Sequence, residues 1–140
     1  MHEYTSRVRV WGLICPGLRE EIGRARRWTR DILSDHPSAD DAVVIVSELG
    51  TNALLHTASG QEDGIFHVAL ALSDHVIVVS VTDAGKSCTA PEVTSADAAA
   101  VHGRGLEMVS TLAHKVAIRD NGHGHTVTAE LLTDARGHRW

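Results

Sequence analysis

Two pairs of short β-rich runs constrain the fold of this chain more than any other feature of its sequence. Residues 65–72 and 76–82 are rich in Val, Ile and Leu and are separated by a short polar turn. Residues 115–119 and 126–132 form a second pair around residues 120–124, whose Asn-Gly-rich composition is typical of a tight turn. Each pair is expected to form antiparallel strands, and such strands must bury one apolar face against another layer.

Helical patterns provide that second layer. Apolar side chains recur at helical spacing within residues 18–33, and residues 39–56 form a longer, nearly apolar helix. Another helix is expected to begin near Leu106, and residues 5–14 alternate in part like an edge strand. The order β-α-α-β-β-α-β-β predicts an α+β two-layer sandwich, with helices on one face of a mixed, mainly antiparallel sheet.

The composition fits one soluble globular domain over residues 1–140. Hydrophobic residues make up 43% of the chain, but only one Phe and one Tyr are present, so Val, Leu, Ile and Ala must build the core. The formal charge of −5 gives no reason to expect nucleic acid or an anionic membrane as a partner. No apolar stretch approaches the roughly 20 residues that cross a bilayer. With two cysteines and no signal-peptide pattern, the chain is expected to be cytoplasmic.

A stripe of polar side chains runs along the apolar helix of residues 39–56. Glu48, Asn52 and His56 follow each other at a spacing of four, which places them on one helical face. Burying such groups is costly unless a metal ion, a phosphate or a reacting water needs them. The carboxylate of Glu48 could take a proton, and the amide oxygen of Asn52 suits Mg²⁺. The alternative is a polar stripe that only faces solvent.

Two glycine-containing segments could complete a nucleotide site. In Asp83-Ala84-Gly85, directly after the strand of residues 76–82, the aspartate could accept a hydrogen bond from an exocyclic amine and the glycine would admit a flat ring. Gly103-Arg104-Gly105 precedes a helix, where backbone N–H groups bind phosphate and an arginine adds a charged contact. Taken alone, each segment is more often a turn or a flexible loop.

Other clusters have plainer interpretations. Five arginines within residues 19–30 are taken as a solvated helix face, with a partner-binding surface as the alternative. The ten histidines show no tight metal-ligand spacing, and His123 and His125, in a hairpin turn, are interpreted as incidental. Neither Cys15 nor Cys88 has a neighbour that would activate a thiol.

The order of the motifs is more specific than any one of them. Glu-x-x-x-Asn on a helix is followed by Asp-x-Gly after a hairpin, a loop of about 20 residues, Gly-x-Gly at a helix start and Gly-x-Thr entering the last strand. This set resembles the GHKL ATP-binding fold of gyrase-type topoisomerases, heat-shock chaperones and histidine kinases. The stretch from Val46 to His56 is similar to the N-box of the small anti-sigma factor serine kinases of the RsbW and SpoIIAB type. The similarity covers roughly residues 10–132.

The resemblance implies roles for the matching positions. Glu48 would be the general base, Asn52 the Mg²⁺ ligand and Asp83 the acceptor for the adenine amino group, whereas His56 would be structural. Further ATP contacts would come from Gly85 beneath the ring, Lys86, Gly103, Arg104, Gly105 and Leu106 along the triphosphate, and Thr126 on the floor strand. The family's usual Asp-x-Gly-x-Gly is altered here, and a phosphate contact from Lys86 would stand in for the second glycine.

The same resemblance implies a regulatory kinase. The protein would bind ATP and Mg²⁺, sequester an RNA polymerase sigma factor, and transfer the γ-phosphoryl group of ATP to a serine of an anti-anti-sigma (STAS-domain) partner. A homodimer is implied as well. The main alternative is an ATP-binding interaction module without significant kinase activity. A detached histidine-kinase catalytic domain and a metal-dependent hydrolase that uses the histidines are further alternatives.

Overall fold

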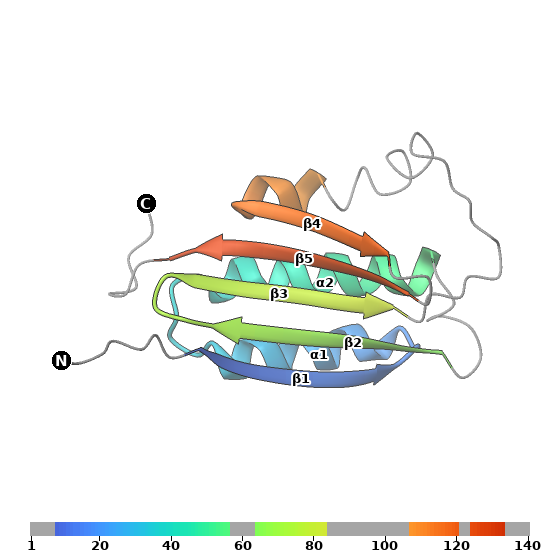
Figure 1. The fold of residues 1–140 in the computed structure, drawn as a ribbon. Coiled ribbons are helices and arrows are strands. Elements are labelled where there is room, and N and C mark those ends of the chain that lie inside the picture. The colour runs from blue at the N-terminus through green and yellow to red at the C-terminus, as the bar shows by residue number, and fades with distance from the viewer. Residues whose placement is uncertain (1–7, 57–63, 84–106, 121–123, 134–140) are drawn as a thin grey trace.

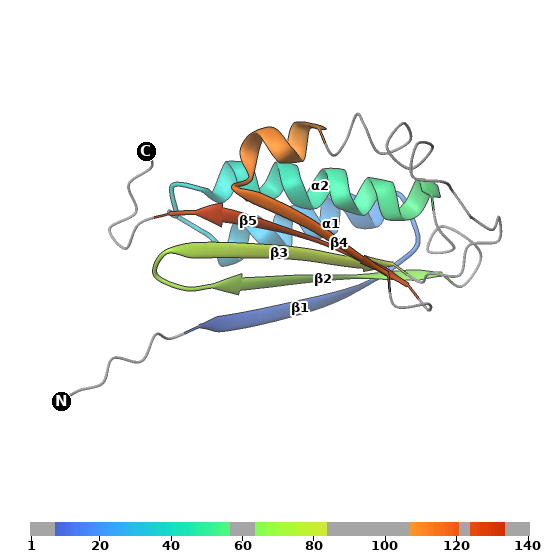
Figure 2. The same cartoon turned by 45° about the horizontal axis from the view of Figure 1, so that its top comes forward.

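The protein folds into two layers, seen in a computed structural model that describes residues 8–56, 64–83, 107–120 and 124–133 (Figure 1). One layer is a five-stranded sheet with the strand order β1-β2-β3-β5-β4. The long helices form the other layer and lie across one face of the sheet (Figure 2). The predicted α+β two-layer sandwich is therefore confirmed.

The elements follow the predicted order. The chain opens with β1 (Arg9–Pro16), α1 (Glu20–Ile32) and α2 (Ala39–His56), and the hairpin strands β2 (Ile65–Leu72) and β3 (Val76–Asp83) come next. Residues 107–112 are helical. The sheet is completed by β4 (Lys115–Asp120) and β5 (His125–Leu132). Helix α2 and strand β2 have the predicted bounds, and the other elements differ from their predicted bounds by a few residues.

The sheet is more regular than the mixed sheet that the sequence suggested. All four pairings among the described strands are antiparallel. Strands β3 and β4 run in the same direction, but β5 lies between them and pairs with both. The strands that could have formed a parallel pair are thus kept apart by the last strand of the chain.

The core lies between the sheet and the helices, and aliphatic side chains build most of it, as the composition required. The only phenylalanine, Phe66, is fully buried. Burying each such side chain contributes about 1.5–3 kcal/mol to folding. The buried residues on the facing surfaces are Phe66, Val68 and Leu70 of β2, Ile77, Val79 and Val81 of β3, and Ala42, Ile45, Val46, Leu49 and Ala53 of α2.

Helix α2 is the element that positions the candidate site. It packs on β3 and on its neighbours β2 and β5, whereas α1 lies beside α2 and contacts β1. The carboxyl ends of α2 and β3 lie at the same end of the molecule in both views (Figures 1 and 2). The motifs of residues 48–56 and the end of β3 are therefore brought together. None of the helices within the described ranges has both the length and the apolar character to cross a membrane.

Candidate functional site

Glu48 and Asn52 lie on one flank of the buried face of α2. The buried face includes Leu49. Gly50 lies on the opposite flank, where the helix backbone closely approaches Ile22 of α1. Successive helical residues are rotated by about 100°, so Glu48 and Asn52 point away from α1 and toward the β3–β5 side of the sheet. Both side chains are half-buried. This burial favours a ligand-binding stripe over one that only faces solvent. His56 is the last residue of the helix.

The amide of Asn52 has an unsatisfied donor. Its Nδ2 atom is buried and has no hydrogen-bond partner among the residues that the structure describes. A buried polar group without a partner costs about 1–3 kcal/mol, and most such groups in folded proteins are therefore satisfied. A polar ligand beside α2 would supply the missing acceptor. This unsatisfied donor thus fits an anionic ligand, such as the phosphate of a bound nucleotide, beside α2.

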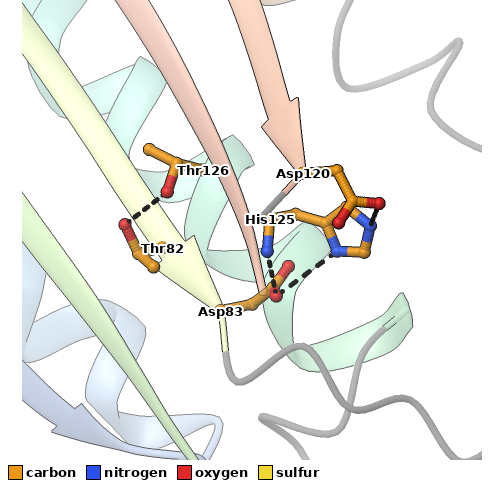
Figure 3. A network of polar contacts seen from close by, with 5 residues as sticks. All are labelled: Thr82, Asp83, Asp120, His125 and Thr126. Atoms are coloured by element: carbon orange, nitrogen blue, oxygen red, sulfur yellow. Dashed lines mark hydrogen bonds and ion pairs between the residues drawn. The ribbon is translucent and has the colours of Figure 1, made fainter. Parts of the chain in front are cut away.

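Asp83 is the last residue of β3, and its carboxylate is largely buried. Its side chain is 9% exposed. It continues the alternation of Val79 and Val81, which places it on the face of the sheet that the helices cover. The backbone N–H of His125 donates a hydrogen bond to Oδ1 of Asp83 at 2.9 Å (Figure 3). An oriented carboxylate of this kind can accept a hydrogen bond from a nucleobase amine.

Thr126 lies on the opposite face of the sheet from Asp83. Its hydroxyl oxygen is 2.9 Å from that of Thr82. Because Thr82 and Asp83 are consecutive in β3, their side chains point to opposite faces. Ser80 and Thr128 repeat the hydroxyl pairing at 3.2 Å. Thr126 thus ties β5 to β3 on the face away from Asp83, and its support of the adenine site from the floor strand stays a prediction.

His125 is the site residue that the sequence reasoning missed. Its imidazole lies between two carboxylates, with Nδ1 3.5 Å from Oδ1 of Asp83 and Nε2 3.3 Å from Oδ2 of Asp120 (Figure 3). The side chain of His125 is 40% exposed and that of Asp120 is 61% exposed, so the cluster opens from Asp83 toward solvent. The interpretation of His125 as incidental is revised here. The only feature of the sequence that could have pointed to His125 is its position directly before Thr126, which was predicted to contact ATP.

The two glycine segments and the residues next to them fall outside the described part of the chain. The predicted contacts in this group are Gly85, Lys86, Gly103, Arg104, Gly105 and Leu106. The helical residues 107–112, which follow them, are held on the core by Val109, a fully buried side chain. The helix that follows the predicted phosphate segment in the sequence therefore packs on the same core as α2 and β3.

The arginines of α1 form the exposed face that the sequence predicted. Arg24 forms an ion pair with Glu21, and Arg30 bonds to Asp40 at 2.8 Å. Gly23, Arg26, Arg27 and Arg30 line a hollow on this face. The surface is separate from the cluster at the end of β3.

A solved structure shares this fold. It contains the RsbU and RsbW domains of Rv1364c from Mycobacterium tuberculosis, with a TM-score of 0.64 and 24% sequence identity. The match covers 89% of this chain and 32% of that chain, so this chain spans only a part of its neighbour's length. No curated protein matches the sequence.

A family comparison identifies the domain itself. The family model of the histidine kinase-like ATPase domain matches residues 16–131, which include α1, α2, β2, β3, β4 and nearly all of β5, but only the last residue of β1. The match confirms the resemblance that the motif order suggested, and a domain of this kind binds ATP. The chain belongs to the histidine kinase-like ATPase domain family.

Proposed function

We propose that this protein is an ATP- and Mg²⁺-dependent serine kinase of the anti-sigma factor type, which phosphorylates a STAS-domain partner. The observation that carries the proposal is the meeting of α2 and β3 at one end of the molecule. The proposal is supported by the half-buried Glu48, by the amide Nδ2 of Asn52, which has no partner among the described residues, and by the oriented carboxylate of Asp83. The N-box similarity of α2 and the fold shared with an RsbW domain support the choice of this branch.

Each of these three residues has a distinct role in the proposed reaction. Asp83 would accept a hydrogen bond from the adenine amino group, Asn52 would give its amide oxygen to Mg²⁺, and Glu48 would accept the proton of the incoming serine hydroxyl. Bound Mg·ATP supplies the γ-phosphoryl group, whose transfer depends mainly on positioning and charge neutralisation. The triphosphate would be bordered by Gly85, Lys86, Gly103, Arg104, Gly105 and Leu106. Thr126 would act indirectly, through the pairing of β5 with β3.

Partner binding would use other parts of the surface. Val8, Val10 and Ile14 are more than half exposed and lie at or in the edge strand β1. Exposed apolar groups on an edge strand support a protein interface, such as that of a homodimer. We expect a sigma factor and the STAS partner to compete for this cytoplasmic protein. A switch between them requires that their relative affinities differ between nucleotide states.

Phosphotransfer with labelled ATP tests the proposal. Purified protein is mixed with a STAS-domain partner and Mg·ATP, and labelled phosphate on the partner serine is measured. Glu48→Gln should lower the rate by about 10²- to 10⁴-fold, because a general base contributes that much, and should leave ATP affinity nearly unchanged. Glu20→Gln on the exposed start of α1 is the matched control. ATP binding without any serine modification, across a panel of STAS partners, would favour the alternative of an interaction module without significant kinase activity.

The hydrolase alternative is separated by metal analysis. Within the described residues, no group of three or more His, Cys, Asp and Glu side chains is arranged to hold a metal ion. The kinase proposal predicts that the purified protein retains no stoichiometric zinc after dialysis. Tight zinc binding together with hydrolysis of a substrate would contradict it.

A further inference from the structure

We infer that His125 is a positioning residue for nucleobase recognition: it holds one oxygen of Asp83 and leaves the other to accept an exocyclic amine. The inference rests on the proposed nucleotide site and concerns the base that this site selects. It assigns a function to a side chain at a position that the sequence motif gave no reason to single out.

The contacts of Asp83 are one-sided. Both of its contacts with the described part of the chain end on Oδ1, one from the backbone N–H of His125 at 2.9 Å and one from the ring Nδ1 at 3.5 Å. His125 therefore holds the carboxylate through its backbone N–H and places its ring nitrogen Nδ1 beside the same oxygen (Figure 3). A carboxylate can accept hydrogen bonds on both oxygens, so the Oδ2 atom of Asp83 can still accept one from a ligand.

The imidazole is itself fixed by a third strand. Its Nε2 lies 3.3 Å from Oδ2 of Asp120, so Asp83 of β3, His125 of β5 and Asp120 of β4 form one chain of polar contacts. With a carboxylate facing each ring nitrogen, either neutral tautomer donates to one of them. A neutral ring donates through one nitrogen at a time, so the tautomer with its proton on Nδ1 restrains Asp83, whereas the tautomer with its proton on Nε2 is restrained by Asp120. A group that is held in place before the ligand arrives loses less freedom when the ligand binds.

One donor in this chain of contacts is still unsatisfied. The buried Nδ1 of His125 has no hydrogen-bond partner within the described residues, because 3.5 Å to Asp83 is an ion-pair distance rather than a good hydrogen bond. A small movement of the carboxylate toward the ring would satisfy it. Polar contacts at functional sites are often long in the free protein and tighten when the ligand binds. The contact between His125 and Asp83 should therefore contribute mainly to the bound state.

Two nucleotides that differ at the purine 6-position separate base recognition from general stability. ATP carries the amine that Asp83 would bind, whereas inosine triphosphate carries an oxygen there. Both dissociation constants are measured by calorimetry in Mg²⁺ buffer. For His125→Ala we expect ATP to bind about three- to tenfold more weakly, the loss typical of one hydrogen bond, with the affinity for inosine triphosphate unchanged. A merely structural role would weaken both nucleotides alike.

Three further variants define the mechanism. His125→Asn places an amide N–H near the position of Nδ1 and should restore most of the preference for ATP. Asp120→Asn should reduce the preference by less than about threefold, because that carboxylate is exposed and acts through the ring. His114→Ala, an exposed histidine that precedes β4 at its other end, is the matched control and should behave as the wild type. Melting temperatures without nucleotide show whether each variant is folded, and His125→Asn keeps the test available if His125→Ala does not fold.

The failure of this inference differs from the failure of the proposed function. An unchanged ratio of the two affinities in His125→Ala would overturn the role of His125, whatever the kinase assay shows. A wild-type protein that binds both nucleotides equally would overturn it as well. By contrast, tight and selective ATP binding without phosphorylation of a STAS partner would contradict only the kinase proposal.

Discussion

Asp83 illustrates how a residue gains a function from its surroundings. In the sequence it opens an Asp-x-Gly segment, a pattern that usually forms a simple turn. In the fold its side chain is 9% exposed and its Oδ1 accepts a hydrogen bond from His125. A carboxylate that is desolvated and oriented in this way binds a donor more strongly than one in water. The burial, rather than the residue type, makes it a candidate for base recognition.

Cys15 illustrates the opposite outcome, in which burial removes reactivity. Its side chain is fully buried, and this burial, together with the nearby charge of Glu21, raises the pKa of the thiol to about 11, although Arg24 acts in the other direction. In a Cys88→Ser background, we expect iodoacetamide at pH 8 to modify the native protein far more slowly than the urea-unfolded chain, because the thiolate is the reactive form. Equal rates in the two states would contradict the burial of this thiol.

The same pKa shift predicts how stability depends on pH. The thiol ionises near 9.0 when exposed and near 11 in the fold, so the unfolded state loses its proton first. The stability that comes from the neutral thiol is complete below pH 9 and is lost as the pH rises from 9 to 11. Urea unfolding across this range should show a smaller decrease for Cys15→Ala than for the wild type. Parallel curves for the two proteins would refute the prediction.

At the scale of elements, α2 contacts four neighbours: α1, β2, β3 and β5. One flank approaches α1 closely at Gly50, the centre packs on β2 and β3, and the other flank carries Glu48 and Asn52. The buried apolar residues of α2 hold the helix on the sheet and on α1, so its remaining flank can carry polar side chains. A rigid helix that is packed on two sides is a suitable support for a site that requires fixed geometry.

Gly50 gives a direct test of the close contact between α1 and α2. A Cβ atom there would lie 2.9 Å from Cδ1 of Ile22 and 3.5 Å from Cε2 of Phe66. Gly50→Ala should change the free energy of unfolding by less than about 1 kcal/mol, because the gain in helix propensity offsets a small shift of the Ile22 tip. Gly50→Val adds two methyl groups and should cost about 1–3 kcal/mol. Urea unfolding of both variants measures the difference, and a Val variant as stable as the Ala variant would show that the interface has spare room.

At the scale of the whole molecule, the two-layer arrangement creates the site. Residues 48 and 52 of α2 and residue 83 of β3 are more than 30 positions apart in the sequence, but α2 packs on β3 and the carboxyl ends of the two elements lie at the same end of the molecule (Figure 1). The covered face of the sheet carries Asp83 and His125, and the other face carries the paired hydroxyls of Thr82 and Thr126. Nucleotide binding is therefore expected to stabilise both layers together.

Thermal unfolding tests this coupling. A ligand that binds only the folded state stabilises it by about 2.7 kcal/mol at a concentration 100-fold above its Kd. Mg·ATP should raise the melting temperature of the wild type, and Asn52→Ala should abolish the Mg²⁺-dependent part of the increase. Ser110→Ala, on an exposed helical position, is the control. No increase at millimolar Mg·ATP would contradict both the proposed site and the ATP binding expected of the family.

Much of the candidate site could be predicted because its motifs are local. Glu48 and Asn52 are separated by one helical turn, so their common face follows from helix geometry without knowledge of the fold. Asp83 follows a run of alternating residues whose strand character is plain. His125 and Thr126 could not be assigned in this way. Their neighbours in space come from β3, and a shift of one residue in strand pairing exchanges the two faces.

The sequence by itself determined the elements, their order and the layer architecture, because hydrophobic periodicity is a property of each segment alone. Only the tertiary structure decided that β5 inserts between β3 and β4 and pairs Thr82 with Thr126. That register turns His125 toward Asp83 and Thr126 away from it. The physical reason is that register depends on hydrogen bonds and packing between segments more than 40 residues apart, as the 42-residue separation of Asp83 and His125 shows.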